Sequence, residues 1–385
     1  MTASAARFLQ IHTLSSYPAT LLNRDDSGLA KRLPFGDATR TRISSQCLKR
    51  HWRTVEDLWA LKNIGEPMAV RSREVPERRL LAPLEAEGVG SPEVRKAVSD
   101  AFAVNLYGKN AAKDRSSRQA LLVGEPEIDS LLSEARAIAL AAKDAKAADA
   151  AVTELFKSQK ANLSALRKRG VMEAGLEAAL FGRMVTSDPD ANTNAAIHVA
   201  HAFTVHKEET ESDYFTVVDD LTQAAGETGT AGLFDTELTA GLFYGYVVID
   251  VPLLVANVGA DPALAGKVAE HLVHLIATVS PGAKKGSTAP YAWADLTLVE
   301  ADNRQPRTLA NAFRKPVDAR INAATDRLAD YVGKVDAAYG VSAARHHTSI
   351  DTTSIPGSSA VNLDAVAAWA RDTVAAWPAT TKSAV

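Results

Sequence analysis

The sequence predicts an α+β protein, because strand-like alternation, a capped helix and a long helix-rich segment occur in one chain. Residues 7–14 alternate as a strand, and a basic amphipathic helix begins near Ser44. Residues 127–169 contain neither Gly nor Pro and are rich in Ala, Leu, Glu and Lys, which favours helix. A strand followed by a helix at the start of the chain suits a ferredoxin-like layout.

Composition indicates a globular chain with an ordinary core. Its 385 residues are 46% hydrophobic and 23% charged. The one cysteine, Cys47, excludes an internal disulfide framework and fits a reducing compartment. The first residues lack the apolar run of a signal peptide, and no stretch has the length of a membrane span. We therefore expect a soluble, cytoplasmic protein with no membrane partner.

Further elements follow from the same patterns. In the first strand, Leu9, Ile11 and Thr13 share one side, and a loop from Ser15 to Thr39 is expected after it. The remaining predictions are strands at 195–206, 242–251 and 296–300 and helices at 261–279, 316–339 and 363–377. The three predicted helices each begin or end beside a Pro or Gly. Residues 187–193, which contain Pro189, are predicted to form a turn.

A basic segment at residues 23–53 is the most informative stretch of the chain. It holds eight Arg or Lys residues against three acids, whereas the whole chain has a formal net charge of −3. A basic island on a mildly acidic protein predicts a localised site for a polyanion.

The end of this segment predicts a short helix with one donor-rich face. Ser44 or Ser45 can cap it, and its N-terminus would favour a phosphate. The two faces are set by the helical period: Gln46, Lys49, Arg50 and Arg53 outward; Cys47, Leu48, His51 and Trp52 inward. Upstream, Arg40 and Arg42 point one way if the chain is extended. An ordinary solvated helix remains the alternative.

Several motifs resemble one family. The segment from Asn23-Arg24-Asp25-Asp26 to Arg42-Ile43-Ser44-Ser45-Gln46-Cys47-Leu48-Lys49-Arg50 resembles the CasC-type backbone subunit of type I-E CRISPR Cascade complexes, in the RAMP superfamily. Further matches follow in family order: Gly182-Arg183-Met184, His201-Ala202-Phe203-Thr204, Phe215 to Leu221, Gly241-Leu242-Phe243-Tyr244, Pro281-Gly282-Ala283-Lys284 and Ala310-Asn311-Ala312-Phe313. The resemblance spans about residues 7–339.

The resemblance implies a modified RNA-recognition-motif palm with a large helical fingers insertion and an extended β-hairpin thumb. The implied boundaries are palm 7–58, fingers 59–196, a palm strand 197–207, thumb 208–240, palm 241–345, and a C-terminal loop and helix 346–385. The first strand carries no aromatic signature of the ordinary RNA-recognition motif, so base stacking on the sheet is not indicated.

The resemblance also implies a non-enzymatic scaffold without cofactor or metal. Its partners would be crRNA, other copies of itself in a helical filament, other Cascade subunits, and target DNA through the guide. The residues expected to touch RNA are Asn23, Arg24, Lys31, Arg40, Arg42, Ser44, Ser45, Gln46, Lys49, Arg50, Arg53, Met184 and Lys284, with Tyr214, Phe215 and Leu233 of the thumb beside displaced bases. The thumb residues could instead pack against the hairpin base or a neighbouring subunit.

Alternatives remain at three places. Asp25-Asp26 could cleave RNA, as an aspartate in a comparable loop does in type III backbone subunits. The whole protein could instead be a free-standing RNA-binding protein that works without other Cascade subunits. Basic residues at 143–169 could guide DNA, but interleaved acids favour a solvated helix. The histidines are not expected to bind metal: His271 and His274 lie on an apolar helix, and His346-His347 is expected in a loop.

Overall fold

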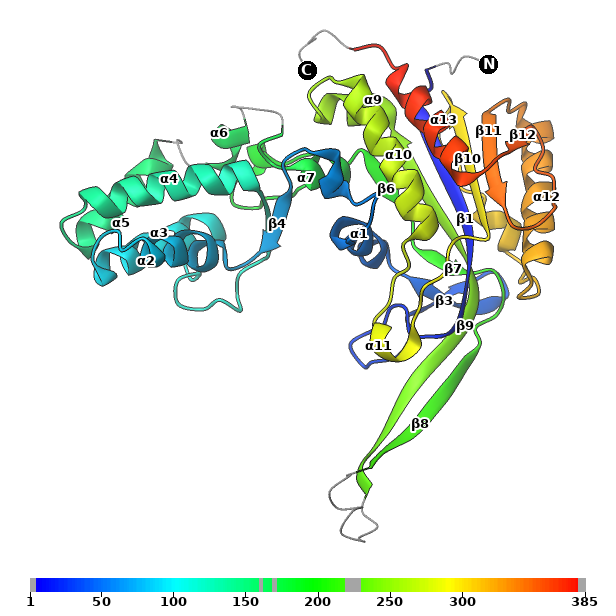
Figure 1. Ribbon diagram of the computed structural model, residues 1–385, viewed down its shortest axis with the longest axis horizontal. Helices are drawn as coiled ribbons and strands as arrows, with labels where there is room; N and C mark the ends of the chain where they lie inside the picture. Colours follow the sequence, from blue (N-terminus) through cyan, green and yellow to red (C-terminus); the bar gives the residue numbers. More distant parts are fainter. Residues whose placement is uncertain (1–4, 159–161, 168–171, 219–229, 380–385) are drawn as a thin grey trace. The chain divides into compact units, whose positions relative to one another are not determined.

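The computed structural model describes residues 5–158, 162–167, 172–218 and 230–379 (Figure 1). The chain divides into two compact units. The first holds residues 1–61, 198–251 and 265–378, and the second holds residues 62–197, 252–264 and 379–385. Strands and helices are both abundant, which confirms the α+β prediction. Within the described ranges, no helix is both long and apolar enough to cross a bilayer.

The first unit is built on one large sheet. Its strands follow the order β12-β11-β10-β1-β9-β7-β3-β2, with β6 and β8 also pairing with β9. Their bounds are β1 Phe8–Thr20, β2 Arg32–Phe35, β3 Ala38–Ile43, β6 Ile197–Val199, β7 Ala202–Thr204, β8 Thr210–Val218, β9 Thr230–Asp250, β10 Leu296–Asp302, β11 Ala344–Ser349 and β12 Ser358–Ala360. The long strands β1 and β9 run antiparallel through its centre.

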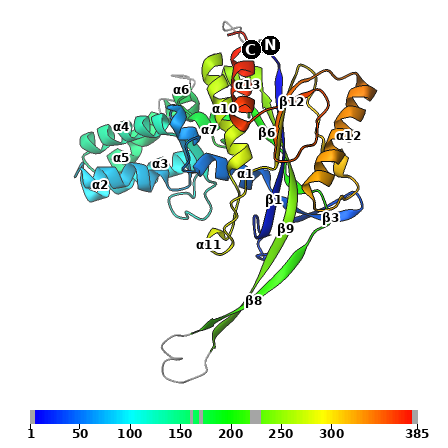
Figure 2. The same ribbon diagram turned by 45° about the vertical axis from the view of Figure 1, so that its right-hand side comes forward.

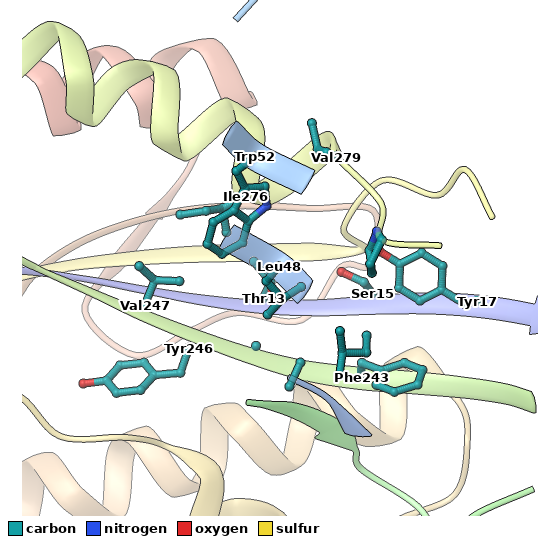
Figure 3. Close-up of a pocket in the computed structure, with 14 residues that line it drawn as sticks. Thr13, Ser15, Tyr17, Leu48, Trp52, Phe243, Tyr246, Val247, Ile276 and Val279 are labelled. Carbon is teal, nitrogen blue, oxygen red and sulfur yellow. The ribbon is translucent and has the colours of Figure 1, made fainter. Parts of the chain in front are cut away.

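Helices cover both faces of this sheet. One face carries α1 (Ser45–Thr54), most of α10 (Pro262–Thr278) and α13 (Leu363–Ala375), and the other carries α12 (Ile321–Tyr339) (Figures 1 and 2). Phe243 and Val247 of β9 lie beneath Trp52 of α1 and Ile276 of α10 (Figure 3). The cavity left there is only about 40 Å³, which is enough for water but not for a substrate.

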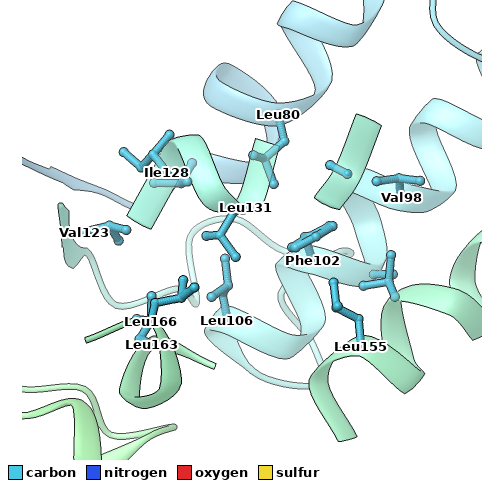
Figure 4. Packing of buried hydrophobic residues seen from close by; sticks show 14 of the residues in the cluster. Leu80, Val98, Phe102, Leu106, Val123, Ile128, Leu131, Leu155, Leu163 and Leu166 are labelled. Carbon is cyan, nitrogen blue, oxygen red and sulfur yellow. The ribbon is translucent and has the colours of Figure 1, made fainter. Parts of the chain in front are cut away.

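The second unit is helical around its own core. Its elements are η1 Leu61–Ile64, β4 Ala69–Ser72, η2 Pro76–Leu81, α2 Ala82–Ala86, α3 Pro92–Tyr107, β5 Leu121–Gly124, α4 Glu125–Ala141, α5 Ala145–Lys157, α6 Leu163–Arg167, α7 Leu176–Phe181 and η3 Pro189–Ala191; α9 (Val251–Asn257) begins at its boundary. Leu80, Phe102, Leu106, Leu131 and Leu155 pack together in the core (Figure 4). The helices expected between residues 127 and 169 are therefore confirmed as far as this stretch is described.

Some sequence predictions need correction. The loop expected from Ser15 to Thr39 is interrupted by strands: β1 continues to Thr20, and β2 and β3 form a hairpin. The single strand expected at 195–206 is split into β6 and β7. His346 and His347 lie in β11, not in a loop, because β11 pairs with β10. The partners of β1, β7 and β11 come from distant parts of the chain, whereas β2 and β3 pair with each other across a short turn.

A buried ion network crosses the sheet on the α12 side. The carboxylate of Glu300 accepts hydrogen bonds from His12 Nε2 (3.0 Å), Arg307 Nη2 (2.9 Å) and Arg345 Nε (2.5 Å). Arg345 also donates to Asp336 of α12 through Nη2 (2.7 Å). Although burial alone would raise the pKa of Glu300, the His12 bond and the two guanidinium groups hold it well below its usual range. The network joins β1, β10, β11 and α12.

Burial favours the neutral form of His12 in this network. Its Nδ1 lies 2.9 Å from the hydroxyl of Tyr244, which accepts the amide of Leu309 at 3.0 Å and also lies 3.3 Å from Thr308 Oγ1. Nε2–H then donates to Glu300. Burial lowers the pKa of His12, outweighing the opposing effect of the Glu300 carboxylate.

Removing the charge of Glu300 should destabilise the protein strongly. In Glu300→Gln the buried Arg345 loses one carboxylate, and breaking a buried pair in this way costs about 3–5 kcal/mol. Asp330→Asn is the matched control, because Asp330 pairs with Lys334 at 2.6 Å on the exposed side of α12. That change should cost less than about 1 kcal/mol. Urea unfolding followed by tryptophan fluorescence measures both, and equal shifts would contradict the prediction.

The neutral state of His12 predicts a loss of stability in mild acid. The pKa of His12 is lower in the folded protein than its unfolded value of 6.5. The stabilisation that comes from a neutral His12 is therefore complete above pH 6.5 and is lost as the pH falls below that value. This group alone should lower the free energy of unfolding by up to about 1.4 kcal/mol per pH unit. His12→Gln should start less stable and fall less steeply between neutral pH and mild acid. Parallel pH profiles for the two proteins would rule out this role.

Candidate nucleic-acid interface

The loop at residues 23–31 is fastened to the start of α1. Asn23 Oδ1 accepts the amide of Ser44 (2.9 Å), and the Asn23 carbonyl accepts the amide of Lys31 (3.0 Å). Ser44 caps the helix, as predicted, because its Oγ accepts the amide of Cys47 at 3.3 Å. Ser44 and Ser45 are both buried. Ser44 holds the loop through its amide and the helix through its hydroxyl, whereas Ser45 Oγ lies 3.5 Å from Gln46 Oε1. Contact of these two serines with RNA stays a prediction.

The two faces of α1 agree with the sequence prediction. Trp52 is buried and Cys47, Leu48 and His51 are half-buried against the sheet. On the other side, Gln46 and Arg50 are exposed, and Lys49 and Arg53 are half-buried. The helix thus has an anchored apolar side and a cationic side.

A second group of cations surrounds an open depression beside this helix. Its volume is about 650 Å³, and it is lined by Arg24, Asp25, Asp26, Ala30, Lys31, Arg32 and Arg42. Arg42 donates from Nη1 to His201 Nδ1 at 3.0 Å, so that nitrogen carries no proton. Burial and the nearby charges of Arg42, Lys31 and Lys49 lower the pKa of His201. The charges of Lys31 and Arg42 from the depression and of Lys49 from α1 all act on His201, so we call the depression and the cationic side of α1 together the basic face.

Not every cation of the basic face has its charge directed to solution. Arg32 pairs with Glu208 and with Glu237, and Glu237 also accepts the amide of Ala30. These two acids lie at the base of the β8–β9 hairpin, so the pairs fix β2 to that base. The sequence pattern did not indicate this contact, because the partners lie far from Arg32 along the chain.

Arg40 is a structural residue. Its side chain is fully buried at 0% exposure, and its guanidinium donates to the carbonyls of Thr204 (2.9 Å), His206 (3.2 Å), Phe313 (2.8 Å) and Phe35 (3.3 Å). The expectation that Arg40 would add a phosphate donor beside Arg42 is therefore wrong. The pleat places both side chains on one side of the strand, but Arg40 is enclosed by the carbonyls it binds, whereas Arg42 is half-buried and lines the open depression.

The β8–β9 ladder projects from the sheet (Figures 1 and 2). It carries exposed aromatic side chains. Phe215 lies opposite Phe234, and their rings stack with centroids 5.7 Å apart. Tyr214 lies on the other face, opposite Asp235, and is also exposed. Leu233 pairs with Thr216 through its backbone, and its side chain lies outside the described residues. Phe234 was not singled out from sequence, although its pairing makes it part of the same surface.

The loop that carries Lys284 is braced on both sides. Lys284 Nζ donates to Thr236 Oγ1 of β9 at 2.6 Å, and the amide of Gly282 donates to His51 Nε2 of α1 at 3.3 Å. A Cβ at Gly282 would lie 2.6 Å from Pro290 Cγ, so glycine fits this close approach. An ammonium has three donors, so Lys284 keeps capacity for a phosphate.

Met184 lies in the helical unit and is 66% exposed. The preceding Arg183 is buried: its Nη1 donates to Glu127 (2.6 Å) and its Nη2 to the carbonyl of Ala191 (3.0 Å). Fixing Arg183 inward leaves Met184 at the edge of an open depression of about 490 Å³, which Arg71 and Gln119 also line.

The two aspartates of the loop differ in their surroundings. Asp25 Oδ1 accepts the amides of Ser27 and Leu29, each at 3.0 Å, and so shapes the loop. Asp26 is exposed in the cationic depression. Among the described residues, no group of three or more His, Cys, Asp and Glu side chains is placed to hold a metal ion.

Comparison with known proteins places the chain in a family. A Cas family model described as CT1975-like protein matches residues 9–373, nearly the whole chain. The protein belongs to the CT1975-like family. A search of curated proteins finds no match.

Two solved structures share this fold over most of the chain. A chain of a CRISPR RNA-guided surveillance complex in a pre-nicking state aligns with a TM-score of 0.76 and 25% identity, covering 94% of this chain and 100% of that chain. A chain of another CRISPR RNA-guided surveillance complex aligns with a TM-score of 0.65 and 24% identity, covering 94% and 99%. The second likeness is one of fold.

The burial of Arg40 predicts that its loss damages stability in this CT1975-like protein. Arg40→Ala leaves carbonyls unsatisfied in the interior, each worth about 1–3 kcal/mol, so the free energy of unfolding should fall by roughly 3 kcal/mol or more. Arg50→Ala, at an exposed position of α1, should change it by less than about 0.5 kcal/mol. Denaturant midpoints measure both. A stable Arg40→Ala protein would show that the guanidinium is dispensable.

Proposed function

We propose that this protein is a non-catalytic crRNA-binding backbone subunit of a type I-E Cascade surveillance complex in antiviral defence. The observation that carries the proposal is the alignment, at 25% identity, over 94% of this chain and all of a chain from a CRISPR RNA-guided surveillance complex. The basic face supports it, because a cationic surface on a chain of net charge −3 suits a polyanion.

The basic face would bind the guide through its phosphates and riboses. Such contacts position the RNA without reading its sequence, as a subunit that accepts any spacer requires, and they make binding depend strongly on salt. The direct contacts proposed are Arg24, Lys31, Arg42, Gln46, Lys49, Arg50, Arg53 and Lys284. Asn23, Ser44, Ser45 and Arg40 would support them from behind, through the hydrogen bonds and burial described above.

The hairpin and Met184 would act on bases. Tyr214, Phe215 and Phe234 offer exposed rings that can stack on a displaced base, and Met184 is proposed to pack near one. Bases between such points stay free for target DNA, so target recognition would belong to base pairing. Copies bound head to tail along one RNA would form a helical filament whose length the RNA sets, alongside other Cascade subunits.

RNA cleavage is the second candidate function. It is favoured by one observation: Asp26 is exposed among Arg24, Lys31 and Arg42 in the cationic depression. It is disfavoured by the use of Asp25 as an acceptor for two backbone amides of the loop.

Purification of the tagged protein from its native host tests the proposal. Repeat–spacer RNAs and other Cascade subunits should co-elute. Lys49→Glu should lose most of the RNA, because it reverses a charge on the basic face. Lys334→Glu is the matched control, because Lys334 lies on α12 at the opposite face of the sheet. This variant should retain the RNA.

The outcomes separate the candidates. Heterogeneous cellular RNA without partner proteins would point to a free-standing RNA-binding protein, and an absence of RNA would overturn the proposal. Regularly spaced cuts in a target RNA, abolished by Asp26→Ala, would favour the nuclease.

A further inference from the structure

Two aromatic side chains stand out beside the basic face. Tyr291 is 73% exposed and Trp293 is 75% exposed, although rings of this size are usually largely buried. They lie between α11 (Lys285–Thr288) and β10, in the loop that also carries Lys284. The functional assignment above uses neither of them.

The backbone beneath these rings is held firmly. Ser280 Oγ donates to the carbonyl of Ala292 (2.8 Å) and accepts the amide of Ala292 (2.9 Å). The amide of Ala294 donates to the carbonyl of Ala277 at 2.7 Å. Ala292 packs against the buried cluster of Tyr17, Phe243 and their neighbours. With Ala292 turned inward, the side chains on either side of it are presented outward from a fixed support.

The charge around the rings suits an anion. Residues 281–294 include two lysines and no acid. Lys285 Nζ lies 6.0 Å from the centroid of the Tyr291 ring. The same loop is tied to α1 by the bond from Gly282 to His51, and the charges of Lys285 and Arg50 both act on His51. The aromatic pair is therefore continuous with the basic face.

We propose that Tyr291 and Trp293 form a stacking platform for unpaired bases of single-stranded RNA. The proposal rests on the proposed function and adds to it a base-stacking surface separate from the hairpin and Met184. Aromatic rings flanked by cations bind single strands with little sequence preference, since every base has a face that can stack. Tyr and Trp are also enriched at protein interfaces, but lysine is depleted there, and Lys285 beside the Tyr291 ring favours RNA over a protein partner.

Equilibrium binding of purified full-length protein to a fluorescent single-stranded repeat–spacer RNA tests the platform. The double variant Tyr291→Ala/Trp293→Ala should bind on the order of tenfold or more weakly, with an unchanged slope of log affinity against log salt, because no phosphate contact is lost. Lys285→Ala should instead reduce that slope. Tyr339→Ala is the matched control, because Tyr339 is 74% exposed at the end of α12. An RNA with abasic sites should weaken binding more for the wild type than for the double variant, because the double variant retains only the base contacts of the hairpin and Met184.

Each other outcome counts against a defined claim. If the wild type binds RNA and the double variant binds equally well, the platform is overturned while the proposed function stands. If the double variant keeps RNA affinity but loses self-association or a Cascade partner, the surface contacts protein and the platform is also overturned. If the wild type binds no RNA at any salt concentration, the proposed function itself fails.

Discussion

The guanidinium of Arg40 holds together the part of the molecule that carries the basic face. It donates to the carbonyl of Phe35 in β2, of Thr204 in β7, of His206 just after β7, and of Phe313. Burial lowers its pKa, although nearby Asp37 opposes the shift. A cation in this position satisfies carbonyls that would otherwise be buried without partners. The hairpin that leads into α1 is therefore fixed from inside the protein, and the cations after it inherit a defined position.

The charges near this point serve two different purposes. Arg32 donates hydrogen bonds to carboxylates of the protein, and Arg40 donates to backbone carbonyls. Arg42 is tied to His201 and to the carbonyl of Arg32 but lines the open depression. The surplus of positive charge in residues 23–53 thus overstates the number of cations available to a ligand. The remaining cations share one surface, so a polyanion site there stays a prediction that rests on fewer side chains.

Local signals in the sequence were sufficient for some elements and not for others. The helix α1 follows from a serine cap and one apolar side, both of which are encoded within ten residues. The extension of β1 is invisible locally because its partner is remote: Thr20 pairs with Thr239. Alternation gave the side of the strand on which Arg40 and Arg42 lie, but their depth depends on what covers them. The exposure of Tyr291 and Trp293 could not be predicted, because they lie in an irregular loop with no helical or strand periodicity.

The long strand β9 explains how a projecting hairpin can act on a ligand. Its first part pairs with β8 and its second part with β1, so one continuous ladder joins the hairpin to the central sheet. Thr236 and Glu237 are neighbours in β9 and so point to opposite faces. Lys284 holds Thr236, and Arg32 holds Glu237, which braces the hairpin on both faces at its base. The rings of Phe215 and Phe234 are therefore carried by a hairpin whose base is fixed to the central sheet. Under the proposed function, a base stacked on them would meet a rigid surface.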